Sequence, residues 1–271
     1  MDFSVLISIY KNEQPEFLRQ CFDSIFSQTL PASEVILVED GPLTEELYSV
    51  IREYEKQHHE LKIIKIPQNM GLGNALNEGL RHCSNDLVAR MDSDDISCPH
   101  RFKEQVSFME SHPDYDVVSA WVDEFLNNPS NVVSTRKLPQ HNNEIIIFGR
   151  KRNPINHPVV MFRHKAVKAA GYYPCFPKAQ VEDYDLWVRM IMKGSKFYNI
   201  PHSLLYYRLS DDFSKRRGGV DYSRREIPQQ YSFYKQNYIS FFQMGFNVMT
   251  RTIIRLLPCS MREIIYKKFL R

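Results

Sequence analysis

The sequence predicts an α/β protein with a Rossmann-like, mostly parallel central sheet flanked by helices, followed by a helical C-terminal extension. Three observations lead to this prediction. Short apolar segments alternate with helical patterns in the first half of the chain, and polar residues or glycines follow each apolar segment. From Ser214 onward the chain is basic and rich in aromatic residues.

Four segments rich in Val, Ile and Leu are typical of short buried strands. They are FSVLISI (3–9), EVILVE (34–39), KIIKI (62–66) and DLVARM (86–91). Between them, apolar residues recur at the spacing of a helix face: Phe17, Leu18, Cys21, Phe22, Ile25 and Phe26 in the first helix, Leu47, Val50, Ile51 and Tyr54 in the second, and Leu72, Ala75, Leu76 and Leu80 in the third. Strands and helices that alternate in this way join through right-handed crossovers, which predicts a parallel sheet covered on both faces.

The second half of the chain has a less regular pattern. It predicts strands near 116–122 and 157–162, a helix near 183–193, strands at 196–200 and 203–208, and helices to the end of the chain.

The composition is that of an ordinary globular protein, because 43% of the 271 residues are hydrophobic and 25% are charged. No apolar run reaches the roughly 18 residues of a membrane-spanning helix, and the N-terminus has neither a basic leader nor a cleavage site. We therefore expect the body of the protein to remain in the cytosol. The five cysteines are far apart and form no Cys-x-x-Cys pair, which favours reduced thiols over zinc or redox chemistry.

Charge is distributed unevenly along the chain. From Ser214 onward there are twelve Lys or Arg residues and three acidic ones, a net charge of +9, and because the whole chain carries +3, the first 213 residues carry −6. A basic terminus with interleaved apolar residues fits an anionic phospholipid surface better than nucleic acid. Its segment SFFQMGFNVMTRTIIRLL suits the membrane interface, and a cap packed on the core or a dimer contact is the alternative.

Polar residues follow all four strands predicted in the first half. They are Tyr10-Lys11-Asn12-Glu13, Asp40-Gly41-Pro42, Pro67-Gln68-Asn69-Met70-Gly71 and Asp92-Ser93-Asp94-Asp95. In a parallel sheet these loops meet at the carboxyl edge, where α/β proteins bind their ligands. The sequence therefore predicts a binding site built from these four loops.

Three carboxylates, Asp92, Asp94 and Asp95, lie within four residues at the end of the fourth strand. Like charges this close require water or a cation, so the segment is either a solvated loop or a site for Mn²⁺ or Mg²⁺. Such a cation would neutralise a diphosphate leaving group. Asp95 has a further alternative as the cap of the helix that follows Pro99.

Two other segments carry candidate functional residues, each with a structural alternative. Asp40 precedes Gly-Pro, which is typical of a turn, but its carboxylate would also suit the N3 hydrogen of uracil. Asp183 lies in VEDYDLWVRM, where acidic residues are typical of a helix start and Trp187 of a core. If Tyr184 and Trp187 instead desolvate Asp183, its carboxylate is suited to act as a general base.

Six motifs together resemble glycosyltransferase family 2, the inverting enzymes with the GT-A fold. In order they are SVLISIYKNE, VILVEDGP, NMGLGNALNEGL, RMDSDD, NHPVVMFRHKAV and VEDYDLWVRM, and they span roughly residues 3–208. The resemblance is greatest to the subgroup that elongates bacterial surface polysaccharides such as O-antigen and exopolysaccharide. It implies a catalytic domain over 1–213, with a nucleotide-sugar-binding half (1–115) and an acceptor-binding half (116–213), and a basic helical extension over 214–271.

The resemblance also implies roles for the matching residues. Tyr10, Glu13 and Asp40 would hold the uridine, Asn69 and Gly71 would line the ribose and diphosphate, Asp92 and Ser93 would contact the nucleotide-sugar, Asp92 and Asp94 would hold the metal, and Asp183 would be the base. Relatives often complete the metal shell with a His or Asp after the last core strand, where YYRLSDD offers Asp211 or Asp212.

Contacts with the acceptor are expected in the second half of the chain. The candidates are Asn156, His157, Glu182 and Trp187, and the alternatives are an ordinary core or surface histidine, an acid at a helix start and a core tryptophan. The basic run at 215–217 is either a clamp on a pyrophosphate or a solvated loop.

The resemblance implies a reaction that moves galactose or glucose from a UDP-sugar to GlcNAc or GalNAc on polyprenyl pyrophosphate, and we expect it at the inner face of the membrane. Inversion of an α-linked donor gives a β-linkage, expected to be β1,3. The Gln-x-x-Arg-Trp motif of processive members is absent, which predicts transfer of one sugar per encounter. The alternatives are a nucleotidyltransferase, although YKNEQPE is no glycine-rich phosphate loop, and a non-catalytic, calcium-dependent carbohydrate-binding module.

Overall fold

The first half of the chain forms four parallel strands, as predicted. The computed structural model describes residues 1–175, 182–209, 219–258, 261–262 and 265. The four strands lie in the order β3 (Leu61–Ile66), β2 (Glu34–Asp40), β1 (Phe3–Ile9) and β4 (Leu87–Asp92). Because β1 lies between β2 and β4, the carboxyl ends of these strands are neighbours at one edge.

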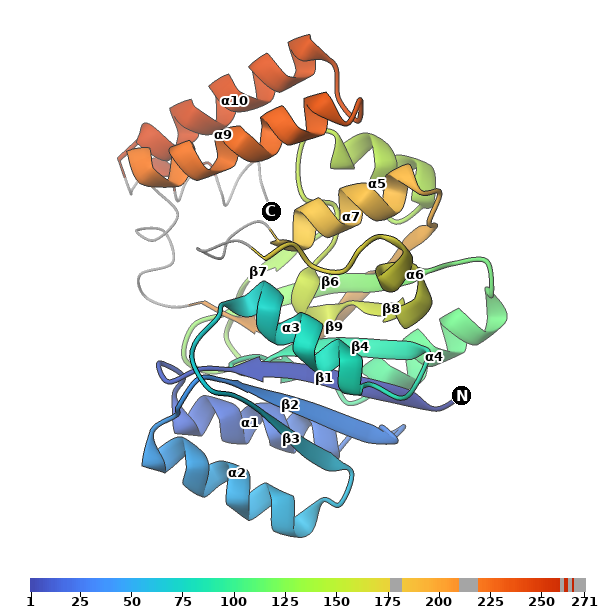
Figure 1. Cartoon of the computed structure of the whole chain (residues 1–271), viewed down its shortest axis with the longest axis vertical. Coiled ribbons are helices and arrows are strands. Elements are labelled where there is room, and N and C mark those ends of the chain that lie inside the picture. Colours follow the sequence, from blue (N-terminus) through green and yellow to red (C-terminus); the bar gives the residue numbers. More distant parts are fainter. Residues whose placement is uncertain (176–181, 210–218, 259–260, 263–264, 266–271) are drawn as a thin grey trace.

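The second half extends the same sheet beyond β4 (Figure 1). β8 (Met161–Arg163) pairs antiparallel with β4 and with β6 (Val117–Phe125), and β9 (Phe197–Arg208) runs parallel to β6. Two short strands complete the sheet: β5 (Ile96–Ser97) pairs with β9, and β7 (Val132–Arg136) pairs with β6.

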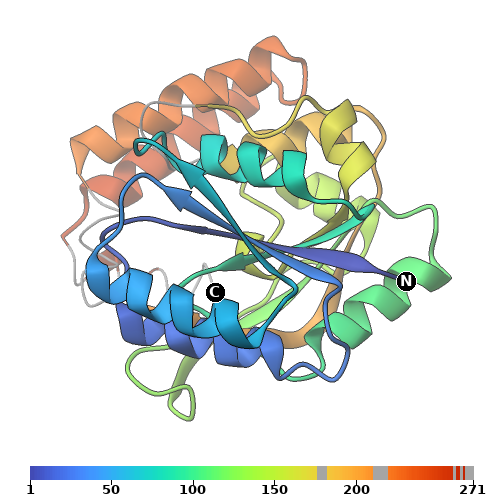
Figure 2. The same cartoon turned by 60° about the horizontal axis from the view of Figure 1, so that its bottom comes forward.

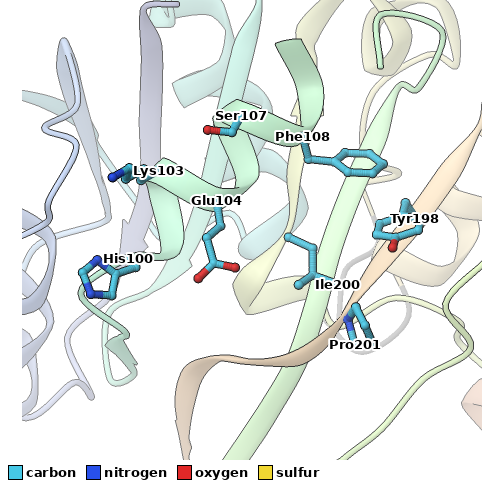
Figure 3. A pocket seen from close by; sticks show the side chains of 8 residues that line it. All are labelled: His100, Lys103, Glu104, Ser107, Phe108, Tyr198, Ile200 and Pro201. Carbon is cyan, nitrogen blue, oxygen red and sulfur yellow. The ribbon is translucent and has the colours of Figure 1, made fainter. Parts of the chain in front are cut away.

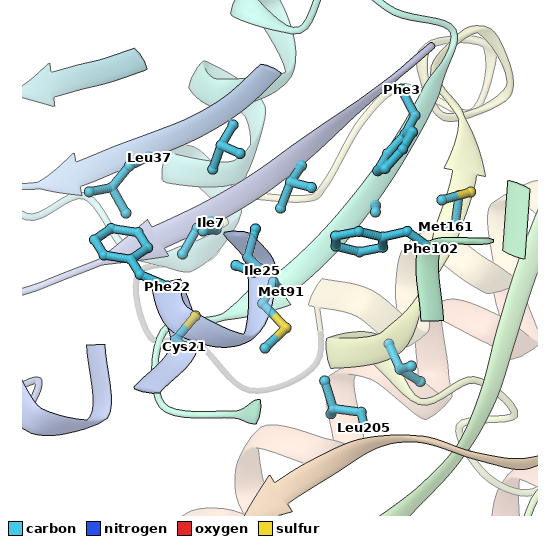
Figure 4. Packing of buried hydrophobic residues seen from close by; sticks show 14 of the residues in the cluster. Phe3, Ile7, Cys21, Phe22, Ile25, Leu37, Met91, Phe102, Met161 and Leu205 are labelled. Carbon is cyan, nitrogen blue, oxygen red and sulfur yellow. The ribbon is translucent and has the colours of Figure 1, made fainter. Parts of the chain in front are cut away.

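Helices cover both faces of the sheet (Figure 2). One face carries α1 (Pro15–Phe26), α2 (Glu45–Gln57) and α4 (Arg101–Ser111), and the other carries α3 (Leu72–His82), α5 (Asn142–Gly149), α6 (His164–Ala169) and α7 (Glu182–Met192). Alternate residues of β1 separate into the two cores, because Val5 and Ile7 join the first and Leu6 joins the second. Figure 4 shows the first core, where Phe22 of α1 and Phe102 of α4 lie over the strands.

Two predicted strand assignments differ from the structure. Residues 157–162 begin as a 3₁₀ turn, η1 (His157–Val159), and β8 is short, because Pro158 has no N–H to donate to a ladder. The strands expected at 196–200 and 203–208 are one strand, β9. Its register with β6 shifts at Pro201 and His202, which have no partner in the ladder.

The C-terminal helices α9 (Val220–Lys235) and α10 (Phe241–Leu256) form a hairpin beside α7 (Figure 1). Phe233 and Tyr238 of this hairpin pack against Tyr184 and Val188 of α7. Among the described residues, no helix is both long and apolar enough to cross a membrane.

Candidate active site

The loops that follow β1, β2, β3 and β4 lie together at the carboxyl edge of the sheet, where the sequence predicted a site. Two hydrogen bonds join them in pairs. Ser93 Oγ donates to Glu13 Oε2 (2.5 Å), and Asn69 Nδ2 donates to Asp40 Oδ2 (3.0 Å). Tyr10 is 45% exposed, so its ring is open to a ligand at this edge.

Asp40 shapes the loop that follows β3. Its buried carboxylate accepts bonds from the main-chain N–H groups of Met70 (2.7 Å) and Gly71 (3.0 Å) as well as from Asn69. Gly41 has a φ of +87°, and a Cβ atom there would lie 2.6 Å from the Asn69 nitrogen. Asp40 therefore has a structural role in holding this loop, which differs from the Asp-Gly-Pro turn considered from the sequence. It fixes the chain that leads into the N-terminus of α3, a helix end that favours anions.

The acid loop, defined as residues 92–95, brings three carboxylates together after β4. One oxygen each of Asp92, Asp94 and Asp95 lies within 4.8 Å of the others. Burial and the charges of Asp92 and Glu13 raise the pKa of Asp94 to about 7. Asp95 is fully buried; its Oδ1 accepts the main-chain N–H of Arg208 (2.8 Å), and its Oδ2 has no partner in the described part of the chain.

This set of oxygen atoms fits a divalent cation. Hard cations such as Mn²⁺ prefer carboxylate oxygens, and a cation would offset the repulsion that raises the pKa of Asp94 and would partner Oδ2 of Asp95. Asp211, the further ligand suggested by the sequence, lies outside the described residues. The alternative of Asp95 as a helix cap is wrong, because α4 begins at Arg101 with His100 at its N-cap.

Two buried arginines border the acid loop, and the sequence analysis missed both. Arg90 of β4 forms an ion pair with Asp92 Oδ1. Arg208, the last residue of β9, donates from Nε to the carbonyl of Asp94 (2.8 Å). Both lie inside motifs singled out for their acids, RMDSDD and YYRLSDD. Asking which cations balance a buried acidic cluster would have identified them.

Asp183 lies in the first turn of α7 and is half-buried. Its Oδ2 accepts a hydrogen bond from Asn153 Nδ2 (2.5 Å). Burial raises the pKa of Asp183, although the Asn153 bond and the charge of Arg90 act in the opposite direction. The charge of Arg90 also opposes the rise in the pKa of Asp94. One guanidinium therefore lies near both the acid loop and Asp183.

Two of the predicted acceptor contacts are wrong because their side chains do not reach the surface. Trp187 is fully buried and packs against the rings of Phe162 and Phe197, as the core alternative expected. Asn156 is 1% exposed and donates to the carbonyl of Ala120 (2.8 Å).

The other two predicted acceptor contacts, His157 and Glu182, are largely buried but keep a small exposed fraction. His157 is 8% exposed and hydrogen-bonds with the Tyr173 hydroxyl (2.9 Å), and burial lowers its pKa well below the usual value. Glu182 is 4% exposed in the first turn of α7. Contacts of these two residues with an acceptor stay predictions, and the basic run at 215–217 lies outside the described residues.

A shallow hollow of about 530 Å³ lies between α4 and the first part of β9 (Figure 3). It is lined by His100, Lys103, Glu104, Ser107, Phe108, Tyr198, Ile200 and Pro201. None of the predicted site residues lines this hollow, so the candidate site is the carboxyl edge of the sheet.

Proteins of known family resemble the chain in sequence. The family model described as Glycosyl transferase family 2 matches residues 4–170. The chain is 41% identical over 269 residues to the UDP-Gal:alpha-D-GlcNAc-diphosphoundecaprenol beta-1,3-galactosyltransferase of Escherichia coli, covering 99% of this chain and 96% of that protein. It is 39% identical over 266 residues to the amylovoran biosynthesis glycosyltransferase AmsE of Erwinia amylovora, covering 98% of each.

Solved structures share the fold at lower sequence identity. S. aureus TarS 1-349 in complex with UDP-GlcNAc has a TM-score of 0.67 at 18% identity, covering 94% of this chain and 72% of that chain. The mannosyltransferase PcManGT from Pyrobaculum calidifontis, in complex with GDP-Man and Mn²⁺, has a TM-score of 0.64 at 17% identity. The match covers 92% of this chain and 68% of that chain. At these identities the likeness concerns the fold alone.

Proposed function

The chain belongs to glycosyl transferase family 2 and is a glycosyltransferase with the GT-A fold, and on that basis we propose that it transfers a hexose from a UDP-sugar, with inversion, to a sugar on polyprenyl diphosphate. The observation that carries the proposal is the acid loop, whose three carboxylates gather at the carboxyl edge of the sheet beside Arg90, and the charge of Arg90 also acts on Asp183. Family membership also rules out the two alternatives, a nucleotidyltransferase and a non-catalytic carbohydrate-binding module.

The acid loop and Asp183 would divide the chemistry between them. Asp92 and Asp94 would hold Mn²⁺ or Mg²⁺, with Asp211 as a further candidate ligand. When bound, the cation supplies the positive charge that stabilises a departing diphosphate. Asp183 would take the proton of the acceptor hydroxyl as that oxygen attacks the anomeric carbon on the face opposite UDP. Inversion of an α-linked donor then gives a β-glycoside.

The loops after β1, β2 and β3 would bind the nucleotide. Tyr10 and Glu13 would hold the uridine with Asp40, which would share its carboxylate between uracil and the loop that it already holds. Asn69 and Gly71 would line the ribose and diphosphate. Ser93 would connect the two sides of the site through its bond to Glu13.

Sequence similarity supports a choice of donor and acceptor. The Escherichia coli relative, 41% identical over nearly the whole chain, is named for transfer from UDP-Gal to GlcNAc-diphosphoundecaprenol in a β1,3 linkage. We therefore favour galactose over glucose as the donor sugar and GlcNAc over GalNAc as the acceptor sugar. The amylovoran relative supports a role in building the repeat unit of a surface polysaccharide such as O-antigen.

A donor screen tests this proposal. The protein is incubated with Mn²⁺, a GlcNAc-diphosphoryl-lipid analogue and either UDP-galactose or UDP-glucose, and the product is identified by NMR. We expect a β1,3-linked galactoside, loss of transfer when EDTA removes the cation, and recovery when Mn²⁺ is added back. Transfer that persists in EDTA would contradict the role of the cation, and transfer from UDP-glucose alone would contradict the choice of donor.

The C-terminal extension supports one more part of the proposal, peripheral attachment to the inner face of the cell membrane. α10 exposes one apolar face, formed by Phe242, Phe246, Met249, Ile253 and Leu256, each of which is 54% or more exposed. These residues recur at the spacing of a single helix face. Such a face is typical of helices that lie in the membrane interface, and a lipid-linked acceptor would be reached there.

A further inference from the structure

We propose that Arg208 is a positioning residue that holds the acid loop in the shape needed to bind a divalent cation. This inference rests on the function proposed above for Asp92 and Asp94. Arg208 is the last residue of β9 and is 7% exposed, so it is placed to act on the loop from inside the protein.

Three hydrogen bonds connect Arg208 to separate parts of the fold. Its main-chain N–H donates to Asp95 Oδ1 (2.8 Å), and its Nε donates to the carbonyl of Asp94 (2.8 Å). Its Nη2 donates to Gln20 Oε1 of α1 (2.6 Å). Arg208 is 113 positions from Asp95 and 188 from Gln20 in the sequence, so a single residue joins the acid loop to both β9 and α1.

Two aromatic rings fix the plane of the guanidinium. Its central carbon lies 4.0 Å from the ring centre of Phe17 in α1 and 4.6 Å from that of Phe125 at the end of β6. An arginine held between two rings can direct Nε and Nη2 along two fixed lines. A lysine would keep the charge of Arg208 but would lack this planar fork, so it would lose the bonds to Asp94 and Gln20.

The way in which Arg208 contacts the acid loop matters for cation binding. Arg208 approaches the loop from the side of Asp94 and Asp95, and Arg90 pairs with Asp92. The guanidinium of Arg208 bonds to the main-chain carbonyl of Asp94 and to Gln20, so these bonds use none of the carboxylate oxygens of Asp92 and Asp94. Arg208 therefore sets the positions of Asp92 and Asp94 and leaves their carboxylate oxygens for a cation.

The test compares Mn²⁺-dependent UDP binding in the wild type and in Arg208→Lys. Calorimetric titration of the full chain with UDP is done once with Mn²⁺ and once with EDTA, so that no turnover is needed. We expect the Lys variant to lose about tenfold or more of its affinity for UDP in Mn²⁺, the effect of losing a charge-assisted bond. In EDTA both proteins should bind UDP more weakly than in Mn²⁺, and their affinities should then be equal.

Arg163→Lys is the matched control. Arg163 is also buried, and it donates to the carbonyls of Tyr115 (2.9 Å) and Met109 (3.0 Å), but it lies at the opposite end of β4, where Leu87 pairs with it. This control should lower Tm by an amount similar to that of Arg208→Lys without changing the Mn²⁺ dependence. Equal effects of the two variants on UDP binding would overturn the proposal.

A milder variant covers the case in which Arg208→Lys does not fold. Gln20→Ala removes the acceptor of Nη2, together with an exposed bond from Gln20 Nε2 to Glu16 Oε1 (3.0 Å), and should weaken Mn²⁺-dependent UDP binding in the same direction by a smaller factor. Unchanged binding in this variant would also overturn the proposal. Failure of the proposed function would look different, because the wild type itself would then bind UDP equally well in Mn²⁺ and in EDTA.

Discussion

At the residue scale, Asp183 combines a raised proton affinity with an oriented carboxylate. Burial raises its pKa, and the bond from Asn153 holds Oδ2 in place. The charge of Arg90 limits that rise, which keeps the carboxylate ionised over a wider pH range. A general base works best when its pKa approaches the working pH without exceeding it.

Asp183→Asn should lower kcat by at least about a hundredfold, because the amide keeps the shape of the side chain but cannot take a proton. The affinity for UDP, measured by calorimetry, should stay close to that of the wild type. In the wild type the protonated carboxyl is inactive. The rate should therefore fall as the pH is lowered. Because the pKa of Asp183 is raised, this fall should begin at a higher pH than it would for an ordinary Asp.

Asp185→Asn is the control for this experiment. Asp185 lies in the same turn of α7 but pairs with Arg189 (2.6 Å), so its loss should lower Tm and leave kcat within a few-fold of the wild type. Near-normal turnover of Asp183→Asn would remove the assignment of the base.

At the element scale, the first half of the fold could be predicted because its signals are local. The strands β1 to β4 and the helices α1 to α3 each carry their own apolar pattern, and the carboxyl-edge rule then located the site. β5 has two residues and β8 has three, and both exist only through pairing with distant segments. A local pattern holds too little information to define such strands, so β5 was not predicted and β8 was predicted with the wrong bounds, at 157–162.

The same division applies to the site. The acid loop and the Asp40 loop could be located from sequence, because each follows a recognisable strand. The contacts of their carboxylates could not be predicted, because they join residues far apart in the sequence. Asp95 accepts a hydrogen bond from Arg208, 113 positions away, and Asp40 accepts one from Met70, 30 positions away. Burial is also a long-range property, which is why the acceptor contact predicted for Trp187 was wrong.

Gly41→Ala should disturb the loop that carries Asn69. The new Cβ atom would lie 2.6 Å from the Asn69 nitrogen and would also be strained at a φ of +87°. We expect UDP binding to weaken by at least about tenfold, because the loop must move away from its position. Gly194→Ala is the control: its φ is +85°, with nothing within 4 Å, so it should lower Tm and leave UDP binding unchanged. Equal UDP binding in the two variants would show that the loop tolerates the clash.

At the scale of the whole molecule, part of the positive charge of the basic extension is paired within the extension itself. Arg251 and Arg255 of α10 pair with Glu226 of α9 (2.8 and 3.1 Å), so these two cations are compensated inside the hairpin. The apolar face of α10 remains open. Attachment to a membrane should therefore depend mainly on burial of this apolar face, and less on the net charge of +9.

Replacing Phe242 and Phe246 together by Ser should abolish most binding to phospholipid vesicles, because these rings are 85% and 57% exposed on the apolar face of α10. Binding is measured by co-sedimentation with neutral and anionic vesicles at low and high salt. The wild type should keep a large part of its binding in high salt, since salt screens charge but not apolar burial. Ile147→Ser, at a position 62% exposed on α5, should bind as the wild type does. If the wild type binds neither vesicle and instead forms a dimer that the double variant disrupts, this face is a contact between subunits and the membrane proposal is wrong.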